Sequence, residues 1–314
     1  MPHSWAWRRM VCSLLLLAVL SATAQDDTLR LPFGRLTLED GLSQGMINSI
    51  AQDHQGFMWF ATKDGLNRYD GYQFHVYRHD PADPGSLAEN YVNVVRSGPD
   101  DRMWLGTGSR GVQVFDPRTE VFTHVPLGPG SEASYVLDIE FDHQGHVWVA
   151  TSSGLFKVDP DPEGPGAGGP KVERVFAEQC RIAIDTKGHV WGYRKATSAF
   201  HISIQKGKTD RIDVLGMTVW SEGLWNSDPQ SNVNGMFAVD GTTGRVFGIH
   251  PFFIAEYDTV TMKARVVQRM AYPSAIRFEP EDVVIDPKGD MWIGSNQCWR
   301  FNTRSGRLTR VLAQ

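Results

Sequence analysis

The sequence is poor in cysteine, has no excess of basic residues and contains no hydrophobic run long enough to cross a membrane. It has three cysteines and a formal net charge of −5 in 314 residues. An acidic balance without a basic stripe argues against a protein that binds nucleic acid. The apolar run from Met10 to Leu20 is shorter than the roughly 20 residues of a transmembrane helix. The remaining composition is that of a globular protein, with ten Trp and 31 Gly as its unusual features.

The first 24 residues have the pattern of a secretory signal peptide. Arg8 and Arg9 precede the short apolar run, and small residues from Ser21 to Ala24 form a cleavage site. We therefore expect residues 1–24 to be removed and the mature chain, residues 25–314, to be exported. An uncleaved membrane anchor is the alternative interpretation of the same segment.

A seven-residue unit, Asp-x-x-Gly-x-x-Trp, is repeated along the chain. Its four complete copies are Asp53, Gly56 and Trp59; Asp142, Gly145 and Trp148; Asp185, Gly188 and Trp191; and Asp286, Gly289 and Trp292. Two further copies are degraded: Trp104 follows shuffled turn residues, and Phe247 replaces Trp after Asp240. The successive aromatic residues are 45, 44, 43, 56 and 45 positions apart, a period typical of propeller repeats. We call this unit the Asp turn and its aromatic residue the anchor residue.

The residue types of the Asp turn favour a structural role. Asp accepts hydrogen bonds within its own turn, and Gly adopts the positive φ that closes it. The strand that contains the anchor residue is apolar almost continuously, so we expect neighbouring sheets to cover both of its faces. Small residues two positions after Trp, such as Gly106 and Ala150, would let those sheets approach closely. A residue that recurs in every repeat serves the scaffold, whereas a catalytic residue occurs once.

Each repeat provides four strands in about 45 residues, which predicts one propeller blade. The expected fold is therefore all-β, a β-propeller of four-stranded antiparallel blades. Six blades are expected, at about residues 46–79, 90–126, 134–177, 180–216, 232–268 and 281–312. Cys180 and Cys298 fall in different blades, which predicts two separate thiols rather than a disulfide.

One further segment, Phe33 to Leu38, resembles the outer strand of a blade. The six repeats already contain their own outer strands, so residues 33–38 are predicted to be the outer strand of a closing seventh blade. The other strands of that blade would lie beyond residue 314, and the six repeats would form an incomplete seven-bladed ring. The alternative is that the segment packs on the last blade as a fifth strand.

The segment from Gly41 to Gly71 resembles the two-component regulator propeller repeat, and its Asp turn at Asp53–Trp59 carries much of the similarity. The stretches Tyr77–Pro81 and Ser86–Val92 are similar to the inter-blade segments of the same family. The resemblance implies the periplasmic sensor region of a hybrid histidine kinase or a diguanylate cyclase. Such proteins place seven-bladed propellers before a membrane span and an output domain. This sequence contains no kinase His-box and no GGDEF-type segment, which argues against signalling activity of its own.

Ligand-binding residues are sought where the repeat is broken. The longest interval, between Trp191 and Phe247, contains an insertion that joins blade 4 to blade 5 on the face where propellers bind ligands. The candidates in this insertion are Trp220, Glu222, Trp225 and Asn226. Two indole rings beside a carboxylate and an amide could stack on and hydrogen-bond a sugar, or the two Trp could simply pack the insertion down. Other loops on the same face contribute Tyr91, Asn93 and Tyr135 to the predicted rim.

These patterns predict a periplasmic ligand-sensing propeller, the input part of a two-component-type receptor, without catalysis of its own. Its ligand would be a small molecule or a glycan, and its partners would be downstream receptor domains or a membrane sensor kinase. The chain could be part of a larger inner-membrane protein, and no cofactor, metal site or nucleic acid is predicted. One alternative is a secreted propeller enzyme, a lyase or hydrolase acting on a polysaccharide or a lactone, with His250, Glu222 and Arg181 in the channel. A protein-interaction platform is the other alternative.

Overall fold

The computed structural model of the chain describes most of the region that contains the repeats. The described residues are 28–128, 134–159, 170–194, 198–205, 208–214, 235–251, 253–261, 263–270, 280–295 and 297–313. The predicted signal peptide and the four candidates Trp220, Glu222, Trp225 and Asn226 lie outside these residues. The described part is built from strands, with one short 3₁₀ helix, Leu38–Asp40. None of its helices is long and apolar enough to span a membrane.

The strands form six sheets, which we number as blades 1 to 6 in chain order. Blade 1 consists of β2 (Ile47–Gln52), β3 (Met58–Thr62), β4 (Gly65–Tyr69) and β5 (Phe74–Tyr77). Blade 2 consists of β6 (Val92–Ser97), β7 (Met103–Thr107), β8 (Val112–Asp116) and β9 (Val121–Val125). Blade 3 consists of β10 (Val136–Phe141), β11 (Val147–Thr151), β12 (Gly154–Asp159) and β13 (Lys171–Phe176). Blade 4 consists of β14 (Cys180–Ile184), β15 (Val190–Arg194), β16 (Ser198–Gln205) and β17 (Lys208–Val214). Blade 5 consists of β18 (Met236–Val239), β19 (Val246–His250), β20 (Phe253–Tyr257) and β21 (Ala264–Arg269). Blade 6 consists of β22 (Asp282–Ile285), β23 (Asp290–Gly294), β24 (Cys298–Asn302) and β25 (Arg307–Ala313).

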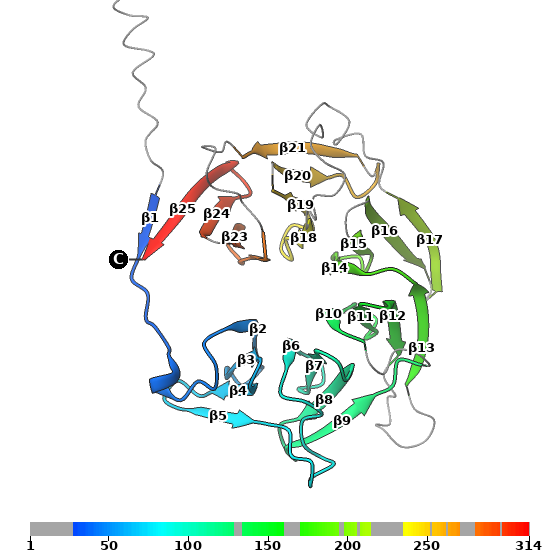
Figure 1. The fold of residues 1–314 in the computed structure, drawn as a ribbon. Helices are drawn as coiled ribbons and strands as arrows, with labels where there is room; N and C mark the ends of the chain where they lie inside the picture. Colours follow the sequence, from blue (N-terminus) through cyan, green and yellow to red (C-terminus); the bar gives the residue numbers. More distant parts are fainter. Residues whose placement is uncertain are drawn as a thin grey trace, which may run out of the picture.

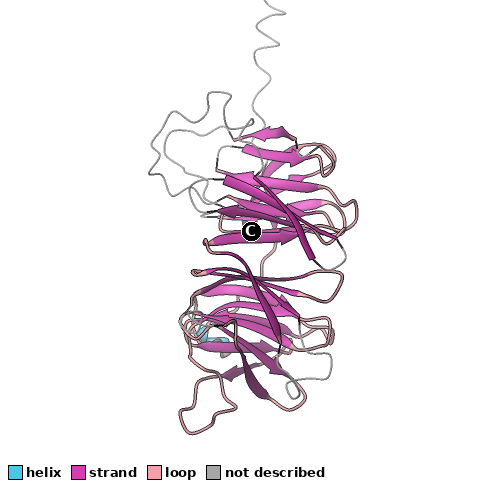
Figure 2. Cartoon of the chain, turned by 90° about the vertical axis from the view of Figure 1, so that its right-hand side faces the viewer, coloured by secondary structure: helices cyan, strands magenta, loops and turns pink. Residues whose placement is uncertain are grey.

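The six sheets surround a central axis, with the first strand of each sheet innermost and the last outermost (Figure 1). Neighbouring strands within each four-strand meander pair antiparallel. Seen edge-on, the molecule is a disc whose loops gather on its two faces (Figure 2). The prediction of an all-β propeller with four-stranded antiparallel blades is therefore confirmed.

The last blade has a fifth strand, which differs from the predicted N-terminal strand. β1 (Thr28–Leu31) pairs parallel with β25, so that Thr28 lies opposite Arg310. No strand is formed over the predicted residues 33–38, and the end of this segment instead begins the 3₁₀ helix. Thr37 caps the 3₁₀ helix: its hydroxyl accepts from the Glu39 amide, and its own amide donates to Asp40 at 2.7 Å. The fifth strand of the last blade is therefore formed by residues 28–31, which precede the predicted segment.

The four complete Asp turns share one set of hydrogen bonds. In blade 3, Oδ1 of Asp142 accepts from the backbone amides of Gln144 and His146 at 2.9 and 3.0 Å. Oδ2 accepts from the indole N–H of Trp148 at 3.0 Å. The corresponding carboxylate–indole distances are 2.8 Å in blade 1 and 3.0 Å in blades 4 and 6. The closing glycine has φ between +82° and +93° in all four copies, a conformation that favours glycine.

The anchor residues of blades 1 to 5 each pack on the blade that follows. The ring of Trp59 lies 5.5 Å from that of Phe115 in blade 2, and Trp191 lies 5.7 Å from Phe237 in blade 5. Trp148 is fully buried with Cys180 and Ile182 of blade 4. In blades 2 to 6, the inner strands also contact the preceding blade. The interior of the propeller is therefore a series of apolar layers, one between each pair of consecutive blades.

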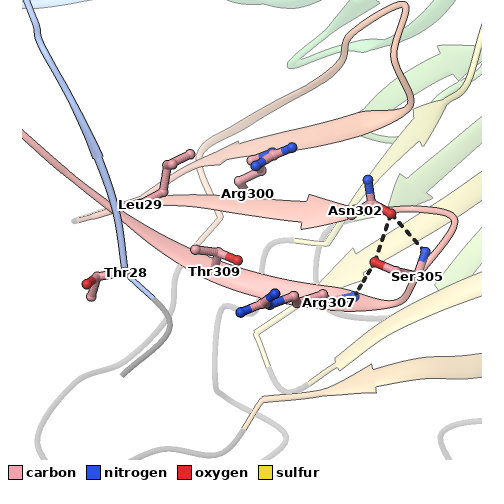
Figure 3. Close-up of a pocket in the computed structure, with 7 residues that line it drawn as sticks. All are labelled: Thr28, Leu29, Arg300, Asn302, Ser305, Arg307 and Thr309. Carbon is pink, nitrogen blue, oxygen red and sulfur yellow. Dashed lines mark hydrogen bonds between the residues drawn. The ribbon is translucent and has the colours of Figure 1, made fainter. Parts of the chain in front are cut away.

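Among the described residues, blade 6 and blade 1 are not packed against each other as the other consecutive blades are. Inner strands of consecutive blades are in extensive contact from β2 to β22, but β22 and β2 are not among these pairs. In each blade, one residue of the innermost strand pairs with the residue that follows the anchor. In blade 1 this residue is Ile50, which is 52% exposed, whereas its counterparts Val95 and Ile139 in blades 2 and 3 are fully buried. Val284, which pairs with the anchor residue of blade 6, is 62% exposed. A cavity of about 380 Å³ opens on the outer part of blade 6, beside β1, Arg300 and Arg307 (Figure 3).

The small residue after the anchor sets the spacing of blades 2 and 3. A Cβ atom at Gly106 would lie 2.4 Å from Cγ1 of Val136 on β10. At the same repeat position in blade 6, a Cβ at Gly294 would meet nothing closer than 3.7 Å. We expect Gly106→Ala to lower the free energy of unfolding by about 1–3 kcal/mol through overpacking. Gly294→Ala should leave it unchanged or raise it by up to about 1 kcal/mol. Chemical denaturation of both variants checks this pair, and equal effects would contradict the proposed spacing role.

The two described cysteines form no disulfide. Cys180 is buried on β14 and Cys298 is exposed on β24, and both are free thiols. The expectation of two separate thiols is confirmed.

Candidate ligand site in the central channel

The inner strands of all six blades line a cavity of about 350 Å³ on the propeller axis. Its wall is apolar toward blade 5, where Met236 and Phe237 contribute, and mixes polar, charged and apolar residues elsewhere. The charged lining residues are Arg96, Asp138, Glu140, Arg181, Glu281 and Asp282. Side chains of both signs thus face one space. The low local dielectric strengthens the interactions of the buried Asp138, whereas Arg181, Glu281 and Asp282 are exposed.

Arg96 on β6 connects three blades across this cavity. Its guanidinium donates to the Ser49 hydroxyl of blade 1 at 3.0 Å and to the Asp138 carboxylate of blade 3 at 3.1 Å. Nε of Arg96 lies 3.6 Å from the Glu140 carboxylate. Asp138 also accepts from the Ile139 amide at 3.0 Å, and its other oxygen faces the Ile182 amide of blade 4 at 3.4 Å. The network therefore ties the walls of the channel together.

Two of the channel carboxylates, those of Asp138 and Glu140, have raised pKa values. Burial raises the pKa of Asp138, against the opposing charges of Arg96 and Arg181. Burial likewise raises the pKa of Glu140 to about 7; Arg96 opposes this shift and the charge of Asp138 adds to it. The Glu140 side chain is 33% exposed, so solvent reaches it from the channel.

A pH dependence of stability follows from Glu140. Its pKa lies near 4.5 when unperturbed and about 7 in the fold, so the native state binds more protons between these values. The free energy of unfolding should therefore fall as pH rises from about 5 to 8. Thermal melts at both pH values should show a smaller pH difference for Glu140→Gln than for the wild type. The exposed Glu173→Gln should leave the wild-type difference intact, and an unchanged difference in Glu140→Gln would contradict the assignment.

The predicted rim residues Tyr91, Asn93 and Tyr135 lie together at this channel. The Tyr135 hydroxyl donates to Oδ1 of Asn93 at 2.6 Å and lies 3.3 Å from the Tyr91 hydroxyl. Nδ2 of Asn93 donates to the Val136 carbonyl at 2.7 Å, which links β6 to β10. Asn93 and Tyr135 line the cavity, whereas Tyr91 supports Tyr135 from behind. Their role in ligand binding stays a prediction.

The residues suggested for an enzyme do not converge within the described structure. Arg181 lines the channel. His250 is buried on β19 against Phe253, at a ring distance of 4.8 Å, and is not among the lining residues. Burial lowers the pKa of His250 to about 3, so the ring is neutral at physiological pH. Glu222 lies outside the described residues.

The sequence analysis missed the charged network, although a signal for it was present. The inner-strand residue opposite the anchor is Ala51 in blade 1, Ala183 in blade 4 and Ala238 in blade 5. At the same position blades 2 and 3 have Arg96 and Glu140. Two charges of opposite sign at a position otherwise occupied by small apolar residues mark a departure from the scaffold. An alignment of the inner strands would have found them.

Comparison with known proteins identifies the repeat. Residues 41–64 match the family model described as Two component regulator propeller. Histidine kinase P4 of Formosa agariphila is 37% identical over 78 residues, which are 25% of this chain and 6% of that protein. The chain therefore spans a small part of that relative.

Solved structures share the fold. The extracellular domain of a putative hybrid two-component system from B. thetaiotaomicron superimposes with a TM-score of 0.65 and 19% identity, over 87% of this chain and 36% of that one. Virginiamycin B lyase from Staphylococcus aureus gives a TM-score of 0.62 and 12% identity, over 84% of this chain and 83% of the lyase. At these identities the similarity shows a common propeller fold. With the family match at residues 41–64, the chain carries the two-component regulator propeller repeat, and the resemblance seen in the sequence is confirmed.

Proposed function

We propose that this chain is a periplasmic ligand-sensing propeller, the input part of a two-component-type receptor, and that it is not catalytic by itself. The observation that carries the proposal is the channel, where a rim of Tyr135 and Asn93 leads to a charged interior. The two-component regulator propeller repeat supports the receptor role.

The channel favours a small polar ligand such as a glycan fragment. Arg96 and Arg181 offer donors, and Asp138, Glu140 and Asp282 offer acceptors, within one cavity. A ligand with several hydroxyl groups can bond to both kinds of group without burying an unpaired charge. Phe237 and Met236 add an apolar surface for its C–H groups.

Calorimetric titration with neutral and uronic-acid-containing oligosaccharides tests the channel site. Tyr135→Phe removes the hydroxyl at the rim, and Arg181→Ala removes a donor inside the channel. Both variants should weaken binding about tenfold, the effect of one or two hydrogen bonds. Tyr72→Phe, at a residue that is 94% exposed, serves as the control and should bind as the wild type does. If both channel variants bind the oligosaccharides as tightly as the wild type does, the channel is not the binding site.

The receptor role is tested by the size of the native polypeptide. An antibody against blade 1 should detect a membrane-associated band several times larger than the 35.1 kDa of this chain. A band of 35.1 kDa in the soluble periplasmic fraction would contradict the receptor role.

A propeller enzyme remains the second candidate, a lyase or hydrolase on a polysaccharide or a lactone. The observation that favours this candidate is the fold similarity to virginiamycin B lyase, which extends over 83% of the lyase. Product analysis after the titrations separates the two candidates, because binding without turnover excludes the enzyme and product formation excludes the non-catalytic sensor.

A further inference from the structure

One residue of each innermost strand lies at the same level of the channel wall. It is the residue that pairs with the position two places after the anchor residue. In blades 1 to 6 this residue is Ser49, Val94, Asp138, Arg181, Met236 and Asp282, respectively. All six line the cavity on the propeller axis. Because the blades repeat around that axis, these residues form one layer of the wall, which we call the channel layer.

Three members of the channel layer are charged, and one of them already has its partners. Asp138 is buried and accepts from the Arg96 guanidinium at 3.1 Å and from the Ile139 amide at 3.0 Å. Arg181 and Asp282, in contrast, are exposed. Neither of these two forms an ion pair with any residue that the structure describes. The layer therefore presents one guanidinium and one carboxylate that are available to a ligand.

An apolar surface separates the two available charges. Arg181 belongs to blade 4 and Asp282 to blade 6, and blade 5 between them contributes Met236 and Phe237 to the cavity (Figure 1). The order along this part of the wall is thus cation, apolar surface, anion.

The Asp282 carboxylate acts across the channel. Burial would lower the pKa of Arg96 in blade 2, but the charges of Asp138, Glu140 and Asp282 together raise it. The Asp282 carboxylate also accepts from the Val283 amide at 2.8 Å, which fixes one of its oxygens beside the strand. A ligand in the channel is therefore within reach of its negative charge.

We propose that the ligand of the channel is a zwitterion, in which apolar C–H groups separate a carboxylate from an ammonium group, as in a short peptide or an acidic disaccharide with a free amine. This inference rests on the proposed ligand-sensing role and narrows the ligand class of that site. Arg181 would bind the carboxylate through two parallel N–H donors. Asp282, with Glu281 beside it, would accept from the ammonium group, and Met236 would contact the C–H groups.

Ligands with a single charge fit this wall less well. Four carboxylates and two guanidiniums line the cavity, so an anion bound at Arg181 would be repelled by the excess of negative charge. A cation bound at Asp282 would leave Arg181 unpaired and would face its positive charge on the same layer. A neutral ligand would pair with neither charge. A zwitterion pairs with both and leaves the net charge of the channel unchanged.

The test compares each zwitterion with forms that lack one charge. Calorimetric titrations use leucyl-leucine, its N-acetyl form and its C-terminal amide. A parallel set uses a disaccharide of glucosamine and glucuronic acid, its N-acetyl form and its methyl ester. We expect at least one zwitterion to bind, and both of its modified forms to bind about tenfold more weakly. Which zwitterion binds distinguishes a peptide from a sugar as the source of the two groups.

Two variants assign each ligand charge to its residue. Arg181→Gln should weaken binding of the zwitterion about tenfold but leave binding of the form without a carboxylate unchanged. Asp282→Asn should likewise weaken the zwitterion but leave the form without an ammonium group unchanged. Both residues are exposed, so the fold should tolerate either change, and the modified ligands test the proposal without any substitution. Glu173→Gln, at an exposed residue of the outer strand β13, is the control and should bind every ligand as the wild type does.

The failure of this inference can be told apart from the failure of the sensor role. Modified forms that bind as tightly as the zwitterions would overturn the inference. Neutral oligosaccharides that bind in the channel more tightly than either zwitterion would also overturn it, while leaving the sensor role intact. If neither the zwitterions nor the oligosaccharides bind, both the inference and the proposed channel site are wrong.

Discussion

Trp148→Ala is expected to lower the free energy of unfolding by about 3–5 kcal/mol, which is the usual cost of deleting a fully buried aromatic side chain. Trp148 has no exposed surface and fills the layer between blades 3 and 4, against Cys180 and Ile182. Its removal also leaves the Asp142 carboxylate without its indole donor. Urea denaturation followed by far-UV circular dichroism measures the change.

Trp292→Ala is the matched control for this prediction. Trp292 makes the same bond to its Asp turn, at 3.0 Å, but is only half-buried because no blade follows it in the described structure. Its replacement should cost less than about 2 kcal/mol, since less apolar surface returns to water. Equal losses at Trp148 and Trp292 would contradict the view that the anchor stabilises mainly through the next blade.

The second large effect is expected for Asp142→Ala, at about 3–4 kcal/mol. The carboxylate accepts two backbone amides and the indole of Trp148. One bond to a charged group contributes about 1.5–3 kcal/mol, and bonds that share one carboxylate add up to less than their separate values. Burial alone would raise the pKa of Asp142, but the bonds from Trp148 and His146 together lower it. Its contribution to stability should therefore be present above the pKa of the unfolded chain and be lost as pH falls through the lower native pKa. Denaturation of the variant at neutral and acidic pH measures both effects.

Asp70→Ala separates the turn from the indole bond. Asp70 also accepts two backbone amides, those of Tyr72 and Gln73, but it is exposed and has no tryptophan partner. A clearly smaller loss than at Asp142 is expected. A loss of the same size would mean that turn closure, and not the buried indole, accounts for the effect.

The fold could be predicted from the sequence because its determinants are local and repeated. Each Asp turn leads directly into its apolar strand, so both can be seen in a short stretch of sequence. The four complete copies all indicate the same propeller blade. The N-terminal strand could not be placed in this way. Phe33 to Leu38 alternates as a strand does, yet Thr37 and Asp40 form a capping box that competes with pairing.

The candidate site was predictable only in part. Tyr91, Asn93 and Tyr135 were found because the sequence places them at one face of the propeller, and the structure brings them together, with Asn93 on β6. Arg96 and Glu140 were overlooked because each is a single substitution inside a regular inner strand. Their proximity depends on how three blades are arranged around the axis, which no local pattern encodes.

The one-way packing of anchor residues has a consequence for cooperativity. Within the described residues of this chain, each of the six blades is coupled to its neighbours in chain order, as the units of a solenoid are. The interior units have two stabilising interfaces and the terminal units have one. Amide hydrogen exchange should therefore be slowest in blades 3 and 4 and fastest in blades 1 and 6, and unfolding should proceed inward from the two ends.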